Sequence, residues 1–346
     1  MAITIRPGAL DRDRDASIGL FRRYLNEAYD TRRFEWLYRD NPAGAGRLWV
    51  ASDATTGEVV GTAGAFPREI HLEGREAIGW VLGDFCVAER YRALGPALAL
   101  QRRCLDELGA TGAVLFHDFP HRRLLPIYQR LRIGPPRLMR RLVRLLRVDG
   151  RIERLVGSRL LGRGLGAAAN AILTRRRHSI RPPAAVVTGL LEGACGPEFT
   201  DLADKVSADY GLCLRRSAAY VDWRYRRNPI RPHDIVTVRQ DGRLAAWAAL
   251  TQDGAAGALV DVFGVPDPEL IASAVEAAVA ALGQRGCATV SVSLLDSHPW
   301  VALFRRLGFS PREESPVILH PLPASGLSAA ALAAAPAFLT QGDQDA

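Results

Sequence analysis

Lysine is nearly absent from this chain of 346 residues. Of its 45 basic residues only Lys205 is a lysine, and the rest are arginines. A phosphate-binding GxxxxGK[ST] loop is therefore excluded, because Asp204 and Val206 flank the single lysine. A pyridoxal Schiff base would need the same residue, and the polar surroundings in residues 201–209 would not activate its amine.

Long apolar runs and paired cysteines are also missing. No stretch has the roughly 18 consecutive apolar residues of a membrane span, and the N-terminus MAITIRPG lacks the apolar block of a secretory signal. We therefore expect a soluble, cytoplasmic protein. The five cysteines form no CxxC pair, so we expect buried thiols, no disulfide framework and no bound metal; they are Cys86, Cys104, Cys195, Cys213 and Cys287.

The net charge of +8 comes from one segment. Residues 137–181 contain thirteen arginines against Asp149 and Glu153, which gives +11 there and −3 over the rest of the chain. Arginine alternates with leucine and valine in this segment, a pattern that predicts a strand followed by an amphipathic helix. No aromatic residue lies among these arginines to stack on a base. We therefore interpret residues 141–184 as a basic amphipathic connector and do not expect a nucleic-acid partner.

The sequence repeats itself at an offset of 187 residues. Residues 36–42 read WLYRDNP and residues 223–229 read WRYRRNP, and each run is followed by strands, a glycine turn and helices in the same order. Strands that alternate with helices at this spacing predict an α/β (α+β) fold used twice, each copy a mixed central sheet flanked by helices. The length also predicts two domains, at roughly 100 to 200 residues each. We place them at residues 1–140 and 185–325, with residues 326–346 as an Ala-rich flexible tail.

A loop that precedes a helix is present in only one of the two copies. In the first copy the strand at residues 80–87 leads into ERYRALGPA and a helix, whereas the corresponding strand of the second copy leads into PDPELIASA. The amides from Arg90 to Gly95 would point outward at the positive end of the helix dipole, where an anion such as a pyrophosphate binds. Gly95 would let that anion approach the backbone closely.

Arg92, Gly95 and Ala97 fit the pattern [RQ]xxGx[GA], and here the sequence resembles the GCN5-related N-acetyltransferase (GNAT) superfamily. The family also has a tyrosine beyond its fifth strand, which Tyr128 matches. Arg132 stands where the family usually has glycine, and the residue after it is isoleucine instead of phenylalanine. The resemblance extends over about residues 3–140 of the chain.

This resemblance implies two tandem acetyltransferase-like domains, of which the second, near residues 195–320, is degenerate. Acetyl-CoA or another acyl-CoA would lie as a co-substrate between the splayed fourth and fifth strands. The acceptor amine would attack the thioester directly, which requires a neutral amine, a polarised carbonyl and a proton for the thiolate. The implied contacts to the acyl-CoA are Val87, Arg90, Tyr91, Arg92, Ala93, Leu94, Gly95 and Ala97.

Three residues are candidates for the proton transfers. Tyr128 aligns with Phe304 of the copy that lacks the loop, so we expect its hydroxyl to protonate the departing thiolate. Asp84 stands on the fourth strand where a general base would lie, but its counterpart Asp261 in the degenerate copy favours an architectural role. Asp118, at the end of the fifth strand, and a chain of waters are the alternatives for the base.

Polar residues at the end of the fifth strand of each copy are candidates for the acceptor site. His117 and His121 lie beside Asp118 in the first copy, and Asp296 and His298 hold a similar place in the second. The two histidines of the first copy have the i, i+4 spacing of metal ligands, but an intervening proline argues against the helix that would align them.

Together these features predict an acyl-CoA-dependent N-acyltransferase. The first copy would perform the chemistry, and the second would shape the pocket for a small-molecule amine or amino-sugar acceptor. Two alternatives stay open. Paired acetyltransferase-like domains also occur in the tRNA-dependent aminoacyltransferases of cell-wall synthesis, which need no CoA loop, and a noncatalytic binding protein would have lost turnover in both copies.

Overall fold

The computed structural model describes residues 2–92, 94–147, 186–231 and 233–344. Most of the predicted connector, from residue 148 onward, lies outside the described residues. We call residues 2–147 the first half and residues 186–344 the second half.

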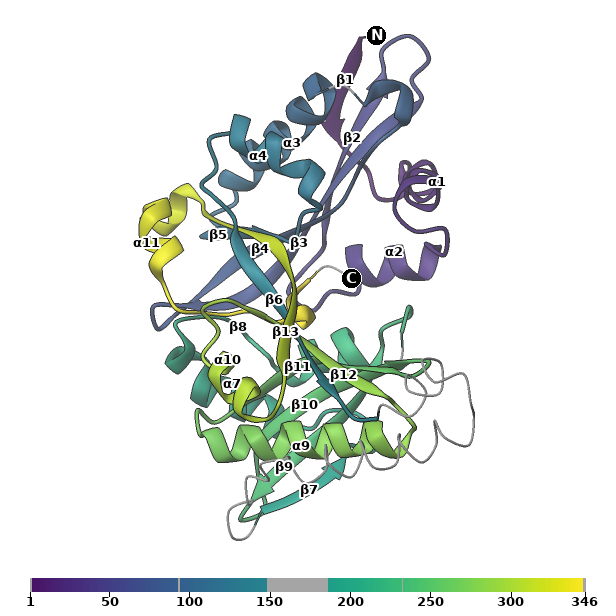
Figure 1. The fold of residues 1–346 in the computed structure, drawn as a ribbon. Coiled ribbons are helices and arrows are strands. Elements are labelled where there is room, and N and C mark those ends of the chain that lie inside the picture. Colours follow the sequence, from purple (N-terminus) through teal and green to yellow (C-terminus); the bar gives the residue numbers. More distant parts are fainter. Residues whose placement is uncertain (1, 93, 148–185, 232, 345–346) are drawn as a thin grey trace.

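The described strands form one 14-stranded mixed sheet that runs through both halves (Figure 1). Its order is β1-β2-β3-β4-β5-β13-β6-β12-β11-β10-β9-β7, with β8 paired to β3 and β14 paired to β8. The strands of the first half are β1 (Ile3–Pro7), β2 (Arg47–Asp53), β3 (Val59–Leu72), β4 (Arg75–Val87), β5 (Leu115–Asp118) and β6 (Arg137–Leu145). Those of the second half are β7 (Val186–Leu190), β8 (Leu212–Leu214), β9 (Asp234–Gln240), β10 (Arg243–Asp253), β11 (Ala256–Gly264), β12 (Thr289–Leu295), β13 (Ser310–Pro321) and β14 (Ala337–Phe338).

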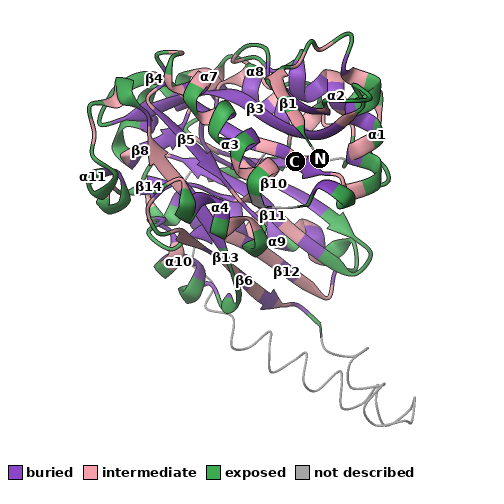
Figure 2. Cartoon of the chain, turned by 90° about the horizontal axis from the view of Figure 1, so that it is seen from above, coloured by how far each residue is buried: buried purple, intermediate pink, exposed green. Residues whose placement is uncertain are grey.

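Helices flank this sheet and expose their outward faces to solvent (Figure 2). In α3 the residues Leu100, Cys104 and Leu108 recur every four positions and are fully buried, which is the periodicity of a helix with one buried face. The predicted α/β class, a mixed sheet with flanking helices, is confirmed. The α-helices of the described residues are α1 (Arg14–Tyr24), α2 (Thr31–Tyr38), α3 (Leu94–Gly109), α4 (Leu125–Arg130), α7 (Glu198–Val206), α8 (Ala218–Val221), α9 (Pro268–Gln284), α10 (Val301–Arg306) and α11 (Ala329–Ala334).

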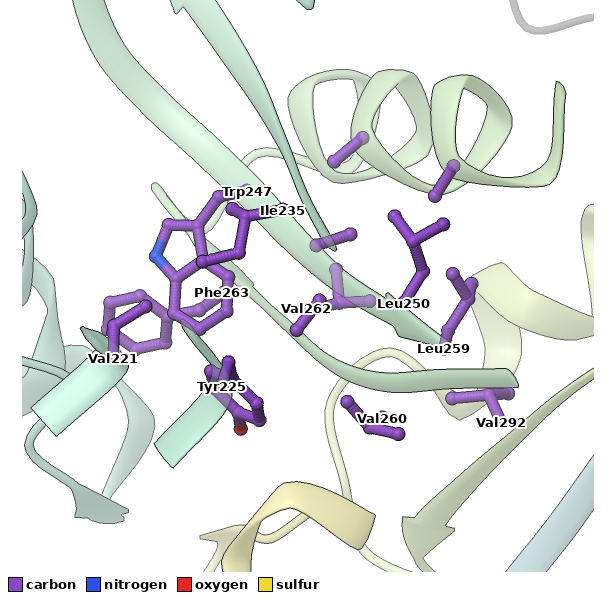
Figure 3. Packing of buried hydrophobic residues seen from close by; sticks show 14 of the residues in the cluster. Val221, Tyr225, Ile235, Trp247, Leu250, Leu259, Val260, Val262, Phe263 and Val292 are labelled. Atoms are coloured by element: carbon purple, nitrogen blue, oxygen red, sulfur yellow. The ribbon is translucent and has the colours of Figure 1, made fainter. Parts of the chain in front are cut away.

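The core of the second half is built on β10 and β11. Trp247 and Phe263 lie side by side there, with ring centroids 6.0 Å apart, and Ile235 and Tyr225 pack around them (Figure 3). All four side chains are buried. This half therefore has an apolar core under its own strands, although β6 of the first half lies between its strands β13 and β12.

The two halves exchange strands at their junction. β6 belongs to the first half by sequence, but it pairs with β12 from the Leu145–Thr289 pair to the Met139–Leu295 pair. β13 of the second half lies between β5 and β6. The boundary predicted at residue 140 therefore falls inside β6. The alternating pattern correctly predicted a strand here, but alternation defines the two faces of a strand and not its neighbours.

The repeated WxYRxNP motifs meet each other in the fold. The indole N–H of Trp36 donates to the carbonyl oxygen of Trp223 at 2.8 Å, and the indole N–H of Trp223 donates to the carbonyl oxygen of Trp36 at 2.9 Å. Their rings stack with centroids 4.7 Å apart. Because each tryptophan donates to the carbonyl oxygen of the other, the two motifs are related here by an approximate twofold rotation. Both tryptophans pack in the interface between the halves.

The last described part of the chain, residues 337–343, is largely buried, unlike the flexible tail that its alanine-rich composition predicted. After β13 the chain forms α11, then β14 and a 3₁₀ turn at Gln341–Asp343. The side chains of residues 337–340 and of Asp343 are buried in the junction between the halves. None of the helices in the described ranges is both long and apolar enough to cross a membrane.

Candidate active site

A cavity opens in the first half where two parallel strands diverge. β4 and β5 pair from Gly79–Leu115 to Val81–His117 and then separate. Parallel strands that separate leave backbone N–H and C=O groups facing the gap. The gap holds a cavity of about 680 Å³, and six of the residues predicted from the sequence line it: Val87, Arg92, Ala97, Asp118, His121 and Tyr128.

A hydrogen-bonded pair of side chains forms the polar part of the cavity wall. The Tyr128 hydroxyl on α4 donates to Oδ2 of Asp118 at the end of β5, and both side chains are buried. Nε2 of Gln101, on α3, lies 3.5 Å from the Tyr128 oxygen. Burial, together with the charge of Asp118, raises the pKa of Tyr128 well above its ordinary value. The phenol therefore keeps its proton at neutral pH.

Asp84 lies at a β-bulge behind the cavity wall. The register between β3 and β4 shifts between Thr62 and Gly64, and Asp84 has a positive φ of 47°. The hydroxyl of Tyr29 donates to Oδ2 of Asp84 at 2.6 Å. A Cβ added at Gly64 would lie 3.2 Å from the Cβ of Asp84, so the backbone packs closely here. The residues on either side of Asp84 line the cavity, whereas Asp84 itself does not.

The counterpart of Asp84 in the second half has a structural role. Asp261 accepts two bonds from the buried guanidinium of Arg216, at 2.8 and 3.2 Å, and one from the Tyr225 hydroxyl, at 2.8 Å. Arg216 stands 187 positions after Tyr29, the donor to Asp84. The two aspartates therefore accept from corresponding donors in each half, which supports an architectural role for Asp84.

The predicted pyrophosphate loop runs from a 3₁₀ turn at Glu89–Tyr91 to the first turn of α3. Nε of Arg92 donates to the carbonyl oxygen of Val87 at 3.1 Å, and its guanidinium lies 4.9 Å from the ring centre of Tyr24. A Cβ added at Gly95 would meet nothing within 4 Å, so the space beside the start of the helix is open. Leu94 begins α3, and residue 93 lies outside the described ranges.

Two of the predicted cofactor contacts brace this loop from outside the cavity. The Arg90 guanidinium pairs with Glu58, and the Tyr91 hydroxyl donates to Asp53. Asp53 is the last residue of β2, and Glu58 lies just before the start of β3. The side chains of Arg90 and Tyr91 therefore fix the loop and do not line the cavity. Their contact with an acyl-CoA stays a prediction.

His117 and His121 lie on opposite sides of the cavity wall. Consecutive side chains of a strand point to opposite faces, so His117 is buried behind β5 while Asp118 faces the cavity. His121 lines the cavity, and its Nδ1 accepts the backbone N–H of Arg123 at 3.2 Å. Of the two histidines predicted for the acceptor site, only His121 is thus placed to contact an acceptor.

The two residues predicted from the second half also lie away from the cavity. His298 is buried, and its Nδ1 accepts the backbone N–H of Trp300 at 3.2 Å. Oδ1 of Asp296 lies 3.6 Å from a guanidinium nitrogen of Arg137. The C-terminal segment lies beside His298, with the ring of Phe338 4.2 Å away, so this region is filled by the chain itself.

Solved structures share this architecture. A protein of Enterococcus faecalis V583, named a "Probable N-Acyltransferase", matches with a TM-score of 0.68 and 11% identity over 93% of this chain and 73% of its own. A GCN5-related N-acetyltransferase from Anabaena variabilis ATCC 29413 matches with a TM-score of 0.66, 11% identity and the same coverage. One from Kribbella flavida has a TM-score of 0.60, 13% identity and coverage of 93% and 72%. The fold is that of the GCN5-related N-acetyltransferases. No family model and no curated protein matches the chain.

In this GNAT fold, several cavity residues were not predicted from the sequence. Cys86 on β4 lines the cavity, and burial raises the pKa of its thiol to about 12. Gln101 on α3 and Phe119 after β5 also line it. The signal for Gln101 was present, because it is a polar residue on the same helical stripe as Cys104 and Leu108. Phe119 follows a strand end and carried no comparable signal.

The lining of the cavity can be compared with the parts of an acyl-CoA. Within the described ranges no three His, Cys, Asp or Glu side chains come together as a metal site. The cavity instead has apolar walls from Leu82, Phe85 and Ile127, and an arginine, Arg92, at the end next to α3. Apolar walls suit a pantetheine chain, and a cation beside open helix amides suits a pyrophosphate.

Proposed function

We propose that the protein transfers an acyl group, acetyl in the simplest case, from acyl-CoA to an amine, and that the first half performs the chemistry. The observation that carries this proposal is the cavity between the diverging strands β4 and β5, with the Tyr128–Asp118 pair in its wall. The GNAT fold supports acyl transfer in general terms, and the residues of the cavity support the finer assignment.

An acyl-CoA bound in the cavity would supply a thioester carbonyl and a thiolate leaving group. The backbone groups of β4 beyond its pairing with β5 would hold the pantetheine, and the amides at the start of α3, with Arg92, would hold the pyrophosphate. With these contacts the thioester would lie beside the end of β5. Holding both reactants there accounts for much of the rate, because attack then becomes effectively unimolecular.

The Tyr128–Asp118 pair can move the protons that the reaction requires. Overall, one proton must leave the attacking nitrogen and one must reach the sulfur. A phenolate beside a carboxylate is disfavoured by charge repulsion, so Tyr128 gives its proton to the sulfur as Asp118 returns one to the phenol oxygen. The proton that Asp118 returns is the one that it has taken from the nitrogen of the acceptor. After the reaction Tyr128 is again protonated and Asp118 is again a carboxylate.

A covalent acyl-enzyme on the cavity cysteine does not fit this site. Cys86 lines the cavity, but burial raises the pKa of its thiol to about 12, and the thiolate is the nucleophilic form. Among the residues that line the cavity, His121 is the histidine that could act as a base toward this thiol. Its Nδ1 already accepts the backbone N–H of Arg123. Direct attack by the amine therefore remains the step that the residues support.

The test is to titrate acetyl-CoA into the purified chain and then to incubate both with a library of small amines and amino sugars, reading products by mass spectrometry. Gly95→Glu places a carboxylate in the open space beside α3 and should weaken acetyl-CoA binding at least tenfold. Gly134→Glu is the matched control, since that glycine also has open space around it and lies outside the cavity. Equal affinities for the two variants, or no acetyl-CoA binding by the native chain, would refute the proposal.

A further inference from the structure

The second half contains a gap between strands that corresponds to the cavity of the first half. β11 and β12 pair in parallel only from Ala256–Thr289 to Leu259–Val292, just as β4 and β5 pair over only three residues and then separate. The other edge of β12 is covered by β6. The backbone groups of β11 and β12 beyond these pairs therefore face each other across a gap that needs an occupant.

Residues 337–344, which we call the C-terminal strap, occupy this gap. Thr340 forms an antiparallel bridge with Leu294 of β12, and the N–H of Leu295 donates to the carbonyl oxygen of Leu339 at 3.0 Å. On the other side the Thr340 hydroxyl donates to Oδ1 of Asp261 on β11 at 3.0 Å. The strap thus bonds to both diverging strands and lies where a ligand would lie in the first half.

The strap is held tightly. A Cβ added at Gly342 would lie 2.1 Å from the Tyr225 hydroxyl oxygen and 3.2 Å from the Cβ of Asp261, so no side chain fits there. Asp343 accepts from the Arg216 guanidinium at 3.0 Å on each carboxylate oxygen, and both side chains are fully buried. A segment with these contacts is a fixed part of the fold.

The strap also reaches the first half. The carbonyl oxygen of Asp343 lies 3.1 Å from Nε2 of His117 on β5. Burial lowers the pKa of His117 to about 4, so the imidazole is neutral near pH 7, and its Nε2–H donates to this carbonyl. The next residue along β5 is Asp118, which faces the cavity and accepts from Tyr128.

We propose that His117 is a positioning residue, and that the C-terminal strap holds the end of β5 through it so that Asp118 and Tyr128 stay in register with the bound thioester. The inference rests on the proposed function, because the placement that it explains is that of the reacting pair. It also gives the second half a role in catalysis that requires neither a second acyl-CoA nor turnover of its own.

The first test separates positioning from packing at His117. His117→Phe keeps a ring but removes the donor, and His117→Gln keeps an N–H donor. We expect His117→Phe to lower kcat by about 10- to 100-fold with KM for acyl-CoA unchanged, since a displacement of about 1 Å can cost 10²-fold in rate. His117→Gln should restore most of the loss. Equal kcat for both variants and the native chain, or equal losses in both, would overturn the proposal.

The second test displaces the strap. Cys213 on β8 is fully buried and pairs with Phe338 of the strap, so its labelling by a thiol reagent reports release of the strap. Gly342→Val should raise the labelling rate of Cys213 at least tenfold, leave buried Cys104 of α3 unlabelled, and lower kcat as His117→Phe does. Gly189→Val, at a glycine with open space on β7, is the control. An open strap with native kcat would overturn the proposal.

Amide hydrogen exchange tests whether the strap holds β5 without measuring enzyme activity. The amides of residues 115–118 should exchange faster in His117→Phe and in Gly342→Val than in the native chain. If the native chain acylates no amine, the proposed function fails while this exchange still reports whether the strap holds β5. If these amides exchange at the native rate in both variants, the strap does not hold the strand and the inference is wrong.

Discussion

The hydroxyl of Tyr128 is the group on which the proposed proton transfer depends. Tyr128→Phe removes it and keeps the ring, which packs with Leu124, Leu125 and Leu131 around the same core cluster. The leaving thiol has a pKa of about 8.5 by analogy with cysteine, so an unprotonated thiolate can still depart. We expect kcat to fall by about 10² to 10⁴, with acyl-CoA affinity and the midpoint of thermal unfolding nearly unchanged.

Tyr220→Phe is the control for this prediction. Tyr220 is a buried tyrosine of the second half that does not line the cavity, and the same change there should leave kcat at the native value. Calorimetry of both variants, with initial rates for the acceptor found in the amine screen, gives the comparison. Native kcat in Tyr128→Phe would make Tyr128 a packing residue.

The two aspartates near the cavity should separate into one structural and one reactive residue. Asp84 accepts from Tyr29 behind the wall, whereas Asp118 lines the cavity. A hydrogen bond to a charged group contributes about 1.5–3 kcal/mol, so Asp84→Asn should lower the unfolding free energy by about that amount and leave kcat near native. Asp118→Asn should lower kcat at least 10²-fold with little loss of stability. Urea unfolding and steady-state kinetics on both variants check this, and the reverse pattern would exchange their roles.

At the scale of single elements, the burial of His117 on β5 makes the free energy of unfolding depend on pH. Its His117 has a folded pKa of about 4, below the ordinary value near 6.5, because burial disfavours the charged imidazole. The unfolded chain therefore binds a proton that the folded chain does not, and stability present above pH 6.5 is lost as the pH falls toward 4. For this one side chain the loss is about 3 kcal/mol.

Urea unfolding at pH 7 and pH 4.5 measures this dependence. Burial lowers the pKa of His298 as well, and raises that of Asp343, which acts in the opposite direction at acid pH. The informative quantity is therefore the difference between the native chain and His117→Gln, which should lose less stability between the two pH values. Identical losses would show that His117 does not titrate in this range.

Local patterns predicted single elements well and their partners poorly. The spacing of Leu100, Cys104 and Leu108 is a property of one helix, so α3 could be predicted from the sequence alone. β6 was predicted as a strand, but its pairing with β12 depends on which edges the rest of the fold leaves open. The same limit applies to His117, because its buried neighbour is Asp343, more than 200 positions away along the chain.

At the scale of the whole molecule, the repeat was the most informative feature of the sequence. It relates Trp36 to Trp223 by position, and these two residues bond to each other across the halves. Arg92, in the loop predicted to bind the pyrophosphate, lines the cavity. The sequence could not show that residues 337–344 would fill the second gap, because alanine-rich composition carries no signal for a strand that pairs across domains.

The strand exchange predicts that neither half folds alone. A fragment of residues 148–346 lacks β6, which leaves the edge of β12 uncovered, and it lacks both neighbours of β13. An uncovered edge of this length promotes aggregation. We expect this fragment and the fragment of residues 1–147 each to be insoluble or to unfold without a cooperative transition when expressed separately.

Expressed together, the same two fragments should assemble into a one-to-one complex. The complex regains the pairing of β6 with β12 and of β13 with β5, so its thermal midpoint should approach that of the intact chain, measured at the same protein concentration. A complex made with Met139→Lys is the control, since Met139 is buried on β6 and a charge there disfavours the shared sheet. If residues 148–346 alone unfold cooperatively near the midpoint of the intact chain, the second half is a self-sufficient domain, and its role in holding β5 would then have to be exerted across an interface between two independent units.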